Sequence, residues 1–194
     1  MKLEIVQAGE AVLRQVARPL AVDEIQSPQL QQTIADMLET LRQATGVGLA
    51  APQVGLSLQL AIIEDREQYQ SSWNPEQLRE RGRVPVGFHV LINPQLEMDG
   101  DEKIDFFEGC LSVAGYTADV PRYRRVRVRY LDQHGQSQQV TAEGWYARIL
   151  QHEIDHLNGA LYVDRMKSRT FMTLKNYTDR WRNSEADARR IFGP

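Results

Sequence analysis

Apolar residues recur at helical spacing in three stretches of this chain. In residues 28–44 and again in residues 145–157 they stand three or four positions apart, which predicts two amphipathic helices with one buried side each. The apolar positions of the first stretch are Leu30, Ile34, Met37, Leu38 and Leu41. Those of the second are Trp145, Ile149, Leu150, Ile154 and Leu157, and Asn158-Gly159 follows as a helix end. From residue 168 onward the pattern predicts a last amphipathic helix and then a basic, polar tail that includes Glu185.

Between these helices the pattern is that of strands. Residues 58–63, 86–93 and 104–107 are apolar runs of strand length, and Pro94 is expected to end the second run. Residues 120–131 alternate between arginine and apolar positions, which predicts one half-buried strand, and residues 136–142 return beside it in a hairpin. Residues 64–85 are polar, charged and proline-bearing, and we expect them to form a surface insertion.

The order of these elements indicates the fold class. Strands that precede the helix at 145–157, helices at both ends and no alternation of strand and helix predict an α+β fold. We expect mixed or antiparallel sheets packed around that central helix, with an N-terminal helix and a C-terminal helix. A length of 194 residues predicts a single domain over residues 1–194, with a core at about 1–171 and a C-terminal helix and tail at 172–194.

Composition indicates the cellular compartment and the kinds of partner that are expected. A net charge of −3 gives no general attraction to DNA or to an anionic membrane, and no apolar run approaches the length of a membrane span. The first residues have neither signal-peptide nor transit-peptide character. One cysteine excludes an intramolecular disulfide and fits a reducing compartment, so we expect a cytoplasmic protein.

The helix at 145–157 carries the strongest chemical signal. His152 and His156 lie one helical turn apart on one face, where both imidazoles can reach one metal ion, and Glu153 beside them can handle the proton of a bound water. A core helix with two chance histidines is the alternative, so a third ligand is needed. Tyr162 occupies the place where one class of metallopeptidases has its third histidine, and Glu185 is the only glutamate after His156.

Cys110 is the remaining soft ligand for such a site. It follows a glycine at the end of an apolar run, and both zinc and ferrous iron accept a set of one cysteine and two histidines with one position open for water. A small buried hydrophobe is the alternative reading of this cysteine.

Two further stretches have more than one interpretation. The loop at 46–55 is glycine-rich but matches neither a phosphate loop nor a dinucleotide fingerprint, and Gln53 is its only side chain that can donate to a substrate oxygen; a plain glycine turn is the alternative. The five arginines of residues 122–129 suggest either the solvated face of an edge strand or an RNA-binding surface. No aromatic stacking platform accompanies them, which favours the edge strand.

Three separate motifs together resemble those of the peptide deformylase family. They are Gly46-x-Gly48-x-Ala50-Ala51-x-Gln53, Glu108-Gly109-Cys110-Leu111-Ser112 and Gln151-His152-Glu153-x-Asp155-His156. The likeness extends to about residue 171 and is closest to the branch that includes mitochondrial deformylases; the short amino terminus favours a bacterial member. Ala114 departs from the proline of many members. The resemblance implies removal of the formyl group from N-formylmethionyl nascent peptides, with release of formate.

The resemblance also implies a role for each motif. The metal ligands would be Cys110, His152 and His156, with Fe²⁺ favoured and Zn²⁺, Ni²⁺ or Co²⁺ as the other candidates. Glu153 would be general base and then acid for water that attacks the formyl carbon, and the donors to the oxyanion would be Gln53 and the Leu111 N–H. Substrate-binding residues would be Gly46 and Gly48 for the peptide backbone, and Glu108, Gly109, Trp145, Arg148 and Ile149 for methionine.

Several alternatives and partners remain open at this point. A zinc metallopeptidase that cleaves an internal amide is the second candidate function, and an RNA- or ribosome-binding module that uses residues 122–129 and the basic tail is the third. Ribosome contact through the basic C-terminal helix is compatible with catalysis. Neither a DNA partner nor a membrane is expected, and the sequence does not indicate an oligomeric state.

Overall fold

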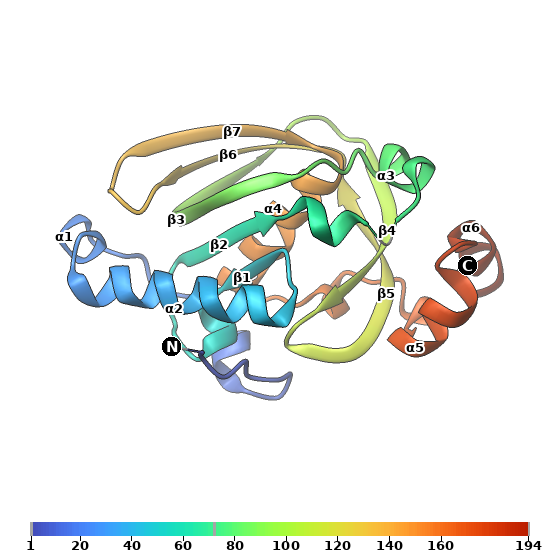
Figure 1. Cartoon of the computed structure of the whole chain (residues 1–194), viewed down its shortest axis with the longest axis horizontal. Helices are drawn as coiled ribbons and strands as arrows, with labels where there is room; N and C mark the ends of the chain where they lie inside the picture. The colour runs from blue at the N-terminus through green and yellow to red at the C-terminus, as the bar shows by residue number, and fades with distance from the viewer. Residues whose placement is uncertain (1, 72, 194) are drawn as a thin grey trace.

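The strands form two antiparallel sheets in a computed structural model, which describes residues 2–71 and 73–193 (Figure 1). The five-stranded sheet has the order β1-β2-β3-β6-β7, and the three-stranded sheet has the order β4-β5-β8. The first sheet consists of β1 (Gly48–Ala50), β2 (Leu60–Asp65), β3 (Val86–Met98), β6 (Arg125–Leu131) and β7 (Ser137–Glu143). The second consists of β4 (Lys103–Cys110), β5 (Val113–Tyr123) and β8 (Met172–Thr173).

Helices occupy both ends of the chain and its middle. They are α1 (Val22–Ile25), α2 (Pro28–Ala44), α3 (Pro75–Arg81), α4 (Gly144–Leu157), α5 (Leu174–Asn176) and α6 (Glu185–Phe192). The predicted α+β fold is therefore confirmed. None of the helices in the described part of the chain is long and apolar enough to cross a membrane.

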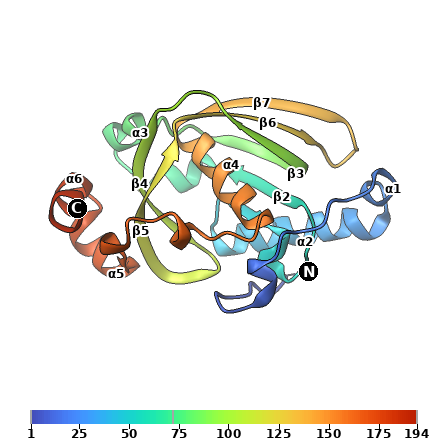
Figure 2. The same cartoon turned by 180° about the vertical axis from the view of Figure 1, so that it is seen from behind.

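Helices α2 and α4 cover opposite faces of the five-stranded sheet (Figures 1 and 2). Neighbouring residues of β2 point to opposite faces: Ile62 packs in the cluster of α2, whereas Ile63 packs in the cluster of α4. Ser27 caps α2 by accepting a hydrogen bond from the Leu30 N–H, and Gly159 with φ of 74° follows α4. The two predicted amphipathic helices are confirmed, and α4 lies at the centre of the molecule.

Two predicted strands are wrong in their limits. Strand β3 passes through Pro94 to Met98, because the pairing with β6 shifts register between Ile92 and Gln95 and Asn93 adopts φ of 50°, so the proline falls at an irregularity of the ladder. The predicted strand 120–131 is two strands, β5 and β6, which belong to different sheets and turn at Arg124.

The predicted surface insertion and polar tail are also corrected. Residues 64–85 contain α3 and two arginines that are nearly fully buried, Arg81 and Arg83. The predicted polar tail contains a helix, because residues 185–192 form α6, and Glu185 is buried. The last predicted helix is interrupted, because α5 and a π-helical turn at Tyr177–Trp181 precede α6. Helices α3, α5 and α6 lie at one end of the molecule (Figures 1 and 2).

Candidate metal centre and its cleft

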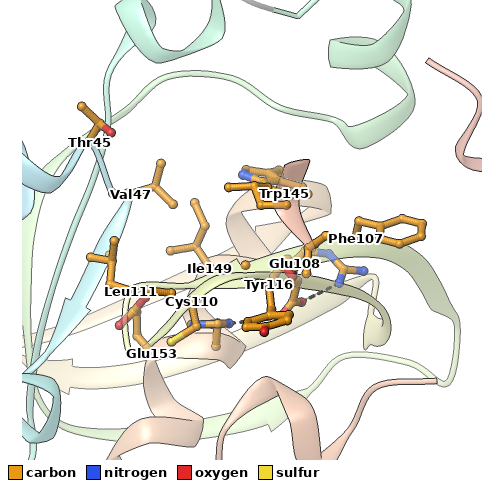
Figure 3. Close-up of a pocket in the computed structure, with 18 of the residues that line it drawn as sticks. Thr45, Val47, Phe107, Glu108, Cys110, Leu111, Tyr116, Trp145, Ile149 and Glu153 are labelled. Carbon is orange, nitrogen blue, oxygen red and sulfur yellow. Dashed lines mark hydrogen bonds and ion pairs between the residues drawn. The ribbon is translucent and has the colours of Figure 1, made fainter. Parts of the chain in front are cut away.

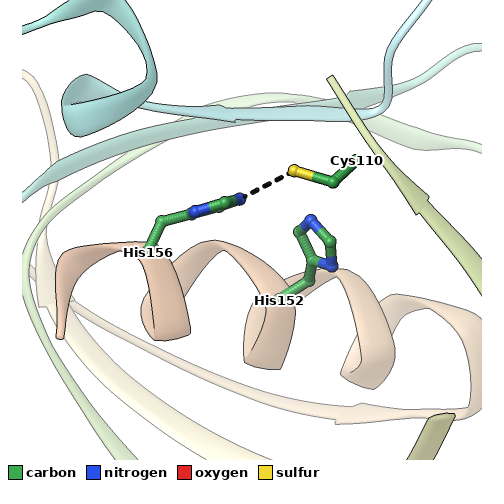
Figure 4. Close-up of side chains that lie close together, drawn as sticks. All are labelled: Cys110, His152 and His156. Carbon is green, nitrogen blue, oxygen red and sulfur yellow. Dashed lines mark hydrogen bonds between the residues drawn. The ribbon is translucent and has the colours of Figure 1, made fainter. Parts of the chain in front are cut away.

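Three donor side chains meet between α4 and the end of β4 (Figure 4). The Cys110 Sγ lies 3.3 Å from the His156 Nε2, and one ligand atom from each of Cys110, His152 and His156 lies within 4.8 Å of the other two. The two imidazoles come from successive turns of α4, and the sulfur comes from a strand 40 to 50 positions earlier in the chain. The predicted set of one thiol and two imidazoles is therefore brought together by the fold.

The donor set fits a divalent metal ion. A tetrahedral ion at ~2.3 Å from sulfur and ~2.0 Å from nitrogen places its donors roughly 3.3–3.6 Å apart. The Cys110–His156 pair already has that separation, and the His152 ring stands at 77° to the His156 ring with centroids 5.0 Å apart. Burial lowers the pKa of His156 well below its usual value, which favours the neutral imidazole that binds metals.

Glu108 orients one of the two imidazoles. Its carboxylate lies 3.0 Å from the His152 Nδ1, so the opposite ring nitrogen is left for the metal position. Arg122 and Arg148 donate to the same buried carboxylate, at 2.9 Å and 2.5 Å. Burial raises the pKa of Glu108, but these two cations and His152 outweigh burial and hold the pKa well below its usual value. The polar atoms of Glu108 and Arg148 thus have partners within the protein, and both residues also line the cleft.

Glu153 has a carboxylate that the surrounding protein does not satisfy. Its Oε2 is buried and has no hydrogen-bond partner among the described residues, and burial raises the pKa of Glu153 to about 7. A side-chain carbon added to Gly48 would stand only 2.2 Å from the Glu153 Oε1. The second glycine of the loop therefore makes room for Glu153, a function that the sequence pattern did not reveal.

Gln53 reaches the sulfur from the loop after β1. Its Oε1 accepts a hydrogen bond from the Ala50 N–H at 2.9 Å, which turns the amide nitrogen towards Cys110. That nitrogen lies 3.5 Å from the Cys110 Sγ and 3.2 Å from the Ser112 Oγ. The side chain of Gln53 is buried, so its amide is held in place beside the donor set.

A cavity of about 480 Å³ opens over these groups (Figure 3). The predicted substrate-binding positions Gly46, Gly48, Glu108, Gly109, Trp145, Arg148 and Ile149 all line it, together with Leu111 and Glu153. Side chains that we did not predict also line it: Trp73, Arg83, Phe107, Tyr116, Leu174 and Tyr177. Trp73 is a tryptophan in an otherwise polar segment, which is a signal that could have marked it.

Comparison with known proteins identifies the family. The family model described as polypeptide deformylase matches residues 2–172. The chain belongs to the peptide deformylase family. The resemblance inferred from the three motifs is confirmed.

Relatives come from bacteria, plants and mitochondria. Peptide deformylase 1 of Streptomyces coelicolor is 45% identical over 92% of this chain and 80% of its own length. The mitochondrial peptide deformylase of Homo sapiens is 40% identical over 86% of this chain and 69% of its own length. The chain spans only 62% of the length of the chloroplastic peptide deformylase 1A of Solanum lycopersicum, at 46% identity over 89% of this chain.

The fold is also that of solved deformylases. The Met-Ala-Ser-bound class I type b peptide deformylase of Acinetobacter baumannii has a TM-score of 0.75 and 34% identity, covering 85% of this chain and 99% of that chain. An actinonin complex of a peptide deformylase from Synechococcus elongatus has a TM-score of 0.72 and 40% identity, covering 86% of this chain and 82% of that chain.

The deformylase match ends before the cleft is complete. Leu174 and Tyr177 lie beyond residue 172, and both line the cavity. Tyr177 stacks on Phe107 with ring centroids 4.9 Å apart, which attaches the C-terminal segment to β4. One wall of the cleft is therefore formed by a part of the chain outside the family match.

Proposed function

We propose that this protein is a metal-dependent peptide deformylase, which hydrolyses the N-formyl group of formylmethionyl peptides and releases formate. The observation that carries the proposal is the unsatisfied, buried carboxylate of Glu153 beside the donor set of Cys110, His152 and His156, at the base of an apolar-lined cleft. A set of metal-binding side chains, a base and a substrate-sized space thus meet at one point. The family membership supports the same activity.

Cys110, His152 and His156 would hold the metal ion. A divalent ion there would lower the pKa of a water molecule towards about 7, so that hydroxide is available near neutral pH. We favour ferrous iron because the motifs resemble those of this family, although the donor set suits zinc equally.

Glu153 would move the protons of the reaction. Its carboxylate accepts a proton from the attacking water and later donates a proton to the amine nitrogen, as the bond between the formyl carbon and that nitrogen breaks. The water oxygen stays on the formyl carbon, and formate leaves. The space that Gly48 leaves for this carboxylate supports its role, since any larger residue would displace it.

Gln53 and the Leu111 N–H would stabilise the oxyanion that develops on the formyl oxygen. The Gln53 amide is held beside Cys110 by its bond to the Ala50 N–H before any substrate arrives, and such preorganised donors lower the barrier by ~2.7–4 kcal/mol each. Leu111 follows Cys110 directly and lines the same cavity.

The substrate backbone would add to β1. This strand is the outermost strand of its sheet and pairs with β2 on one side, so its other edge can pair with an extended peptide. Pairing of main chains is independent of most side chains, which suits an enzyme that accepts many sequences after methionine. The methionine side chain would enter the part of the cavity near Val47, Trp145 and Ile149.

Formate release from formyl-Met-Ala-Ser under anaerobic conditions, with metal analysis of the same sample, tests this function. We expect formate and one equivalent of divalent metal. New amines from an unblocked peptide, without formate, would instead indicate a zinc metallopeptidase. Glu153→Ala should keep the metal and lose ~10²–10⁴-fold in kcat, whereas the exposed Glu143→Ala on the preceding strand should keep full activity.

A contact of the C-terminal helix with the ribosome stays a prediction. Arg189 and Arg190 of α6 lie near Glu185 and Asp187, at 3.5 Å and 3.1 Å, so part of the positive charge of this helix has partners within the protein.

A further inference from the structure

A buried ion pair joins the C-terminal helix to the insertion. Arg81 ends α3 and Glu185 begins α6, and the Arg81 Nη2 donates to the Glu185 Oε1 at 2.5 Å. The side chains are 2% and 7% exposed. The Tyr177 hydroxyl donates to the same glutamate oxygen, and the Gln77 amide donates to the Arg182 carbonyl at 3.2 Å. Two segments 104 positions apart are thereby held as one unit.

Arg81 also contacts the aromatic side chains that form a wall of the cleft. Its guanidinium lies over the rings of Trp73, Phe106 and Trp145, at 4.4, 4.8 and 5.9 Å from their centroids. Trp73 and Trp145 line the cavity directly, and the Phe106 ring packs edge-on against Trp145. Arg83, Arg148 and Arg182 also lie over one or two of these rings, but among the described residues Arg81 is the cation that lies over all three.

The backbone of Arg81 is also fixed against the helix that carries the histidines. A side-chain carbon on Gly144, the first residue of α4, would stand 2.6 Å from the Arg81 carbonyl oxygen. This close approach places the end of α3 directly on the start of α4, next to Trp145. A displaced Arg81 would therefore move Trp145 before it moved the imidazoles, which lie about two and three turns further along α4.

We propose that Glu185, through Arg81, is a positioning residue for the cleft wall that contacts the first side chain of the substrate. The C-terminal helix, beyond the family match, then sets the selectivity of the site without touching the reacting atoms. Glu185 is the nearest anionic partner of this buried arginine, and the Arg81 Nε has no hydrogen-bond partner among the described residues. Loss of Glu185 leaves this buried cation with the exposed carboxylate of Glu80, 3.8 Å away, as its remaining anionic partner among the described residues, which is unfavourable enough to draw the guanidinium away from the rings. The proposal rests on the proposed function.

Kinetics of Glu185→Gln and Glu185→Ala with two substrates test this inference. The substrates are formyl-Met-Ala-Ser and formyl-Ala-Ala-Ser, which differ only in the side chain that meets the wall. Since a methylene in an apolar pocket changes kcat/KM by ~10–200-fold, we expect the preference for methionine to fall by about threefold to tenfold, mainly through KM. The alanine variant should show the larger change, because glutamine keeps the shape and an acceptor.

Two further variants and two further measurements separate positioning from general stability. Asp187→Asn changes an exposed residue of the same helix, whose partner is Arg190, and should leave the preference unchanged. Arg81→Lys keeps a charge for Glu185 but loses the planar stacking, so it should shift the preference in the same direction even if Glu185→Ala does not fold. Circular dichroism and metal content should match those of the unchanged protein.

An unchanged preference for methionine in folded, metal-loaded Glu185→Gln and Arg81→Lys would overturn the inference and leave the pair as a purely structural contact. Failure of the unchanged protein to release formate would instead overturn the proposed function. In that case the wall is tested by comparing the affinities for Met-Ala-Ser and Ala-Ala-Ser, measured through the quenching of the fluorescence of Trp73 and Trp145. We expect the preference for Met-Ala-Ser to fall in the same variants and in the same order.

Discussion

Arginines that are neighbours in the sequence lie in two very different environments. Arg122 on β5 is 3% exposed and pairs with Glu108 at 2.9 Å and with Asp155. Arg127 and Arg129 on β6 are 43% and 54% exposed and lie beside Glu97 of the adjacent strand. The difference arises at Arg124, where the chain leaves one sheet and enters the other.

The comparison shows that the sheet on which an arginine lies, and not the residue type, decides how much it contributes to stability. On β6 the charges face solvent and acidic partners, so each pair contributes little to stability and the surface is less suited to RNA. On β5 the charge is enclosed beside the metal centre, where Asp155 also binds Arg165 at 2.6 Å. Removal of a charge from such a network leaves its partners uncompensated.

The largest effect is expected for Arg122→Met. This change leaves the buried carboxylates of Glu108 and Asp155 short of one cation, so the free energy of unfolding should fall by ~3–5 kcal/mol. Urea denaturation followed by circular dichroism measures it, with Arg129→Met as the matched control on the exposed face. A loss as small as that of the control would mean that Arg148 and Arg165 suffice for the two carboxylates.

Glu108→Gln should have the next largest effect, on metal affinity. The variant keeps the shape of the side chain but loses the charge that orients His152, and the loss of a group that orients a metal ligand typically weakens metal binding by ~10–100-fold. Competition of the protein with a chromophoric chelator measures the affinity. Glu97→Gln is the control. Equal metal affinities of the two variants would show that Glu108 does not support metal binding.

Arg129→Ala should change stability only slightly. Its pairing with Glu97 is exposed, so we expect a loss of ~0.2–1 kcal/mol in urea denaturation, and less at high salt. A double-mutant cycle with Glu97→Ala isolates the pair. A coupling as large as that expected for Arg122 would show that exposure does not separate the two environments.

Asp119→Asn should give the smallest effect, with the opposite sign. Asp119 is fully buried on β5, and its nearest cations, Lys167 and Arg189, are 3.5 Å and 3.7 Å away. Burial raises the pKa of Asp119, so the folded protein binds a proton more tightly than the unfolded chain, and stability falls as pH rises through the raised pKa. Asparagine removes this cost, so the variant should have a higher Tm than the unchanged protein in thermal denaturation at pH 7. This gain in Tm should disappear in acid, below the unfolded pKa of 3.8.

Much of the fold was predictable because its signals are local. Helices α2 and α4 follow from apolar spacing over a few turns, and the hairpin of β6 and β7 follows from alternation around a turn. For the same reason, the spacing of His152 and His156 predicted that both imidazoles can reach one metal ion from one helix face. The choice of Cys110 came from chemistry and from the resemblance to a family, and the structure brings its sulfur to the imidazoles.

The errors all lie where distant segments meet. Residues 120–131 keep one alternating pattern across a corner between two sheets, because each sheet buries alternate positions in the same way. Glu185 and Arg81 are polar residues in polar stretches, and nothing within a few positions of either one indicates a buried partner 104 positions away. The use of Gly48 likewise depends on Glu153, which belongs to another element.

The sequence by itself therefore determined helices α2 and α4, the class of fold and the family. Spacing along the chain predicted the two helices and the histidine pair, whereas the choice of Cys110 and the family came from the resemblance of three motifs. Only the tertiary structure decided which charges are buried: Glu108 and Arg122 beside the imidazoles, and Arg81 with Glu185 behind the cleft. The physical reason is that burial of a charge is stable only when an opposite charge from another segment arrives at the same place.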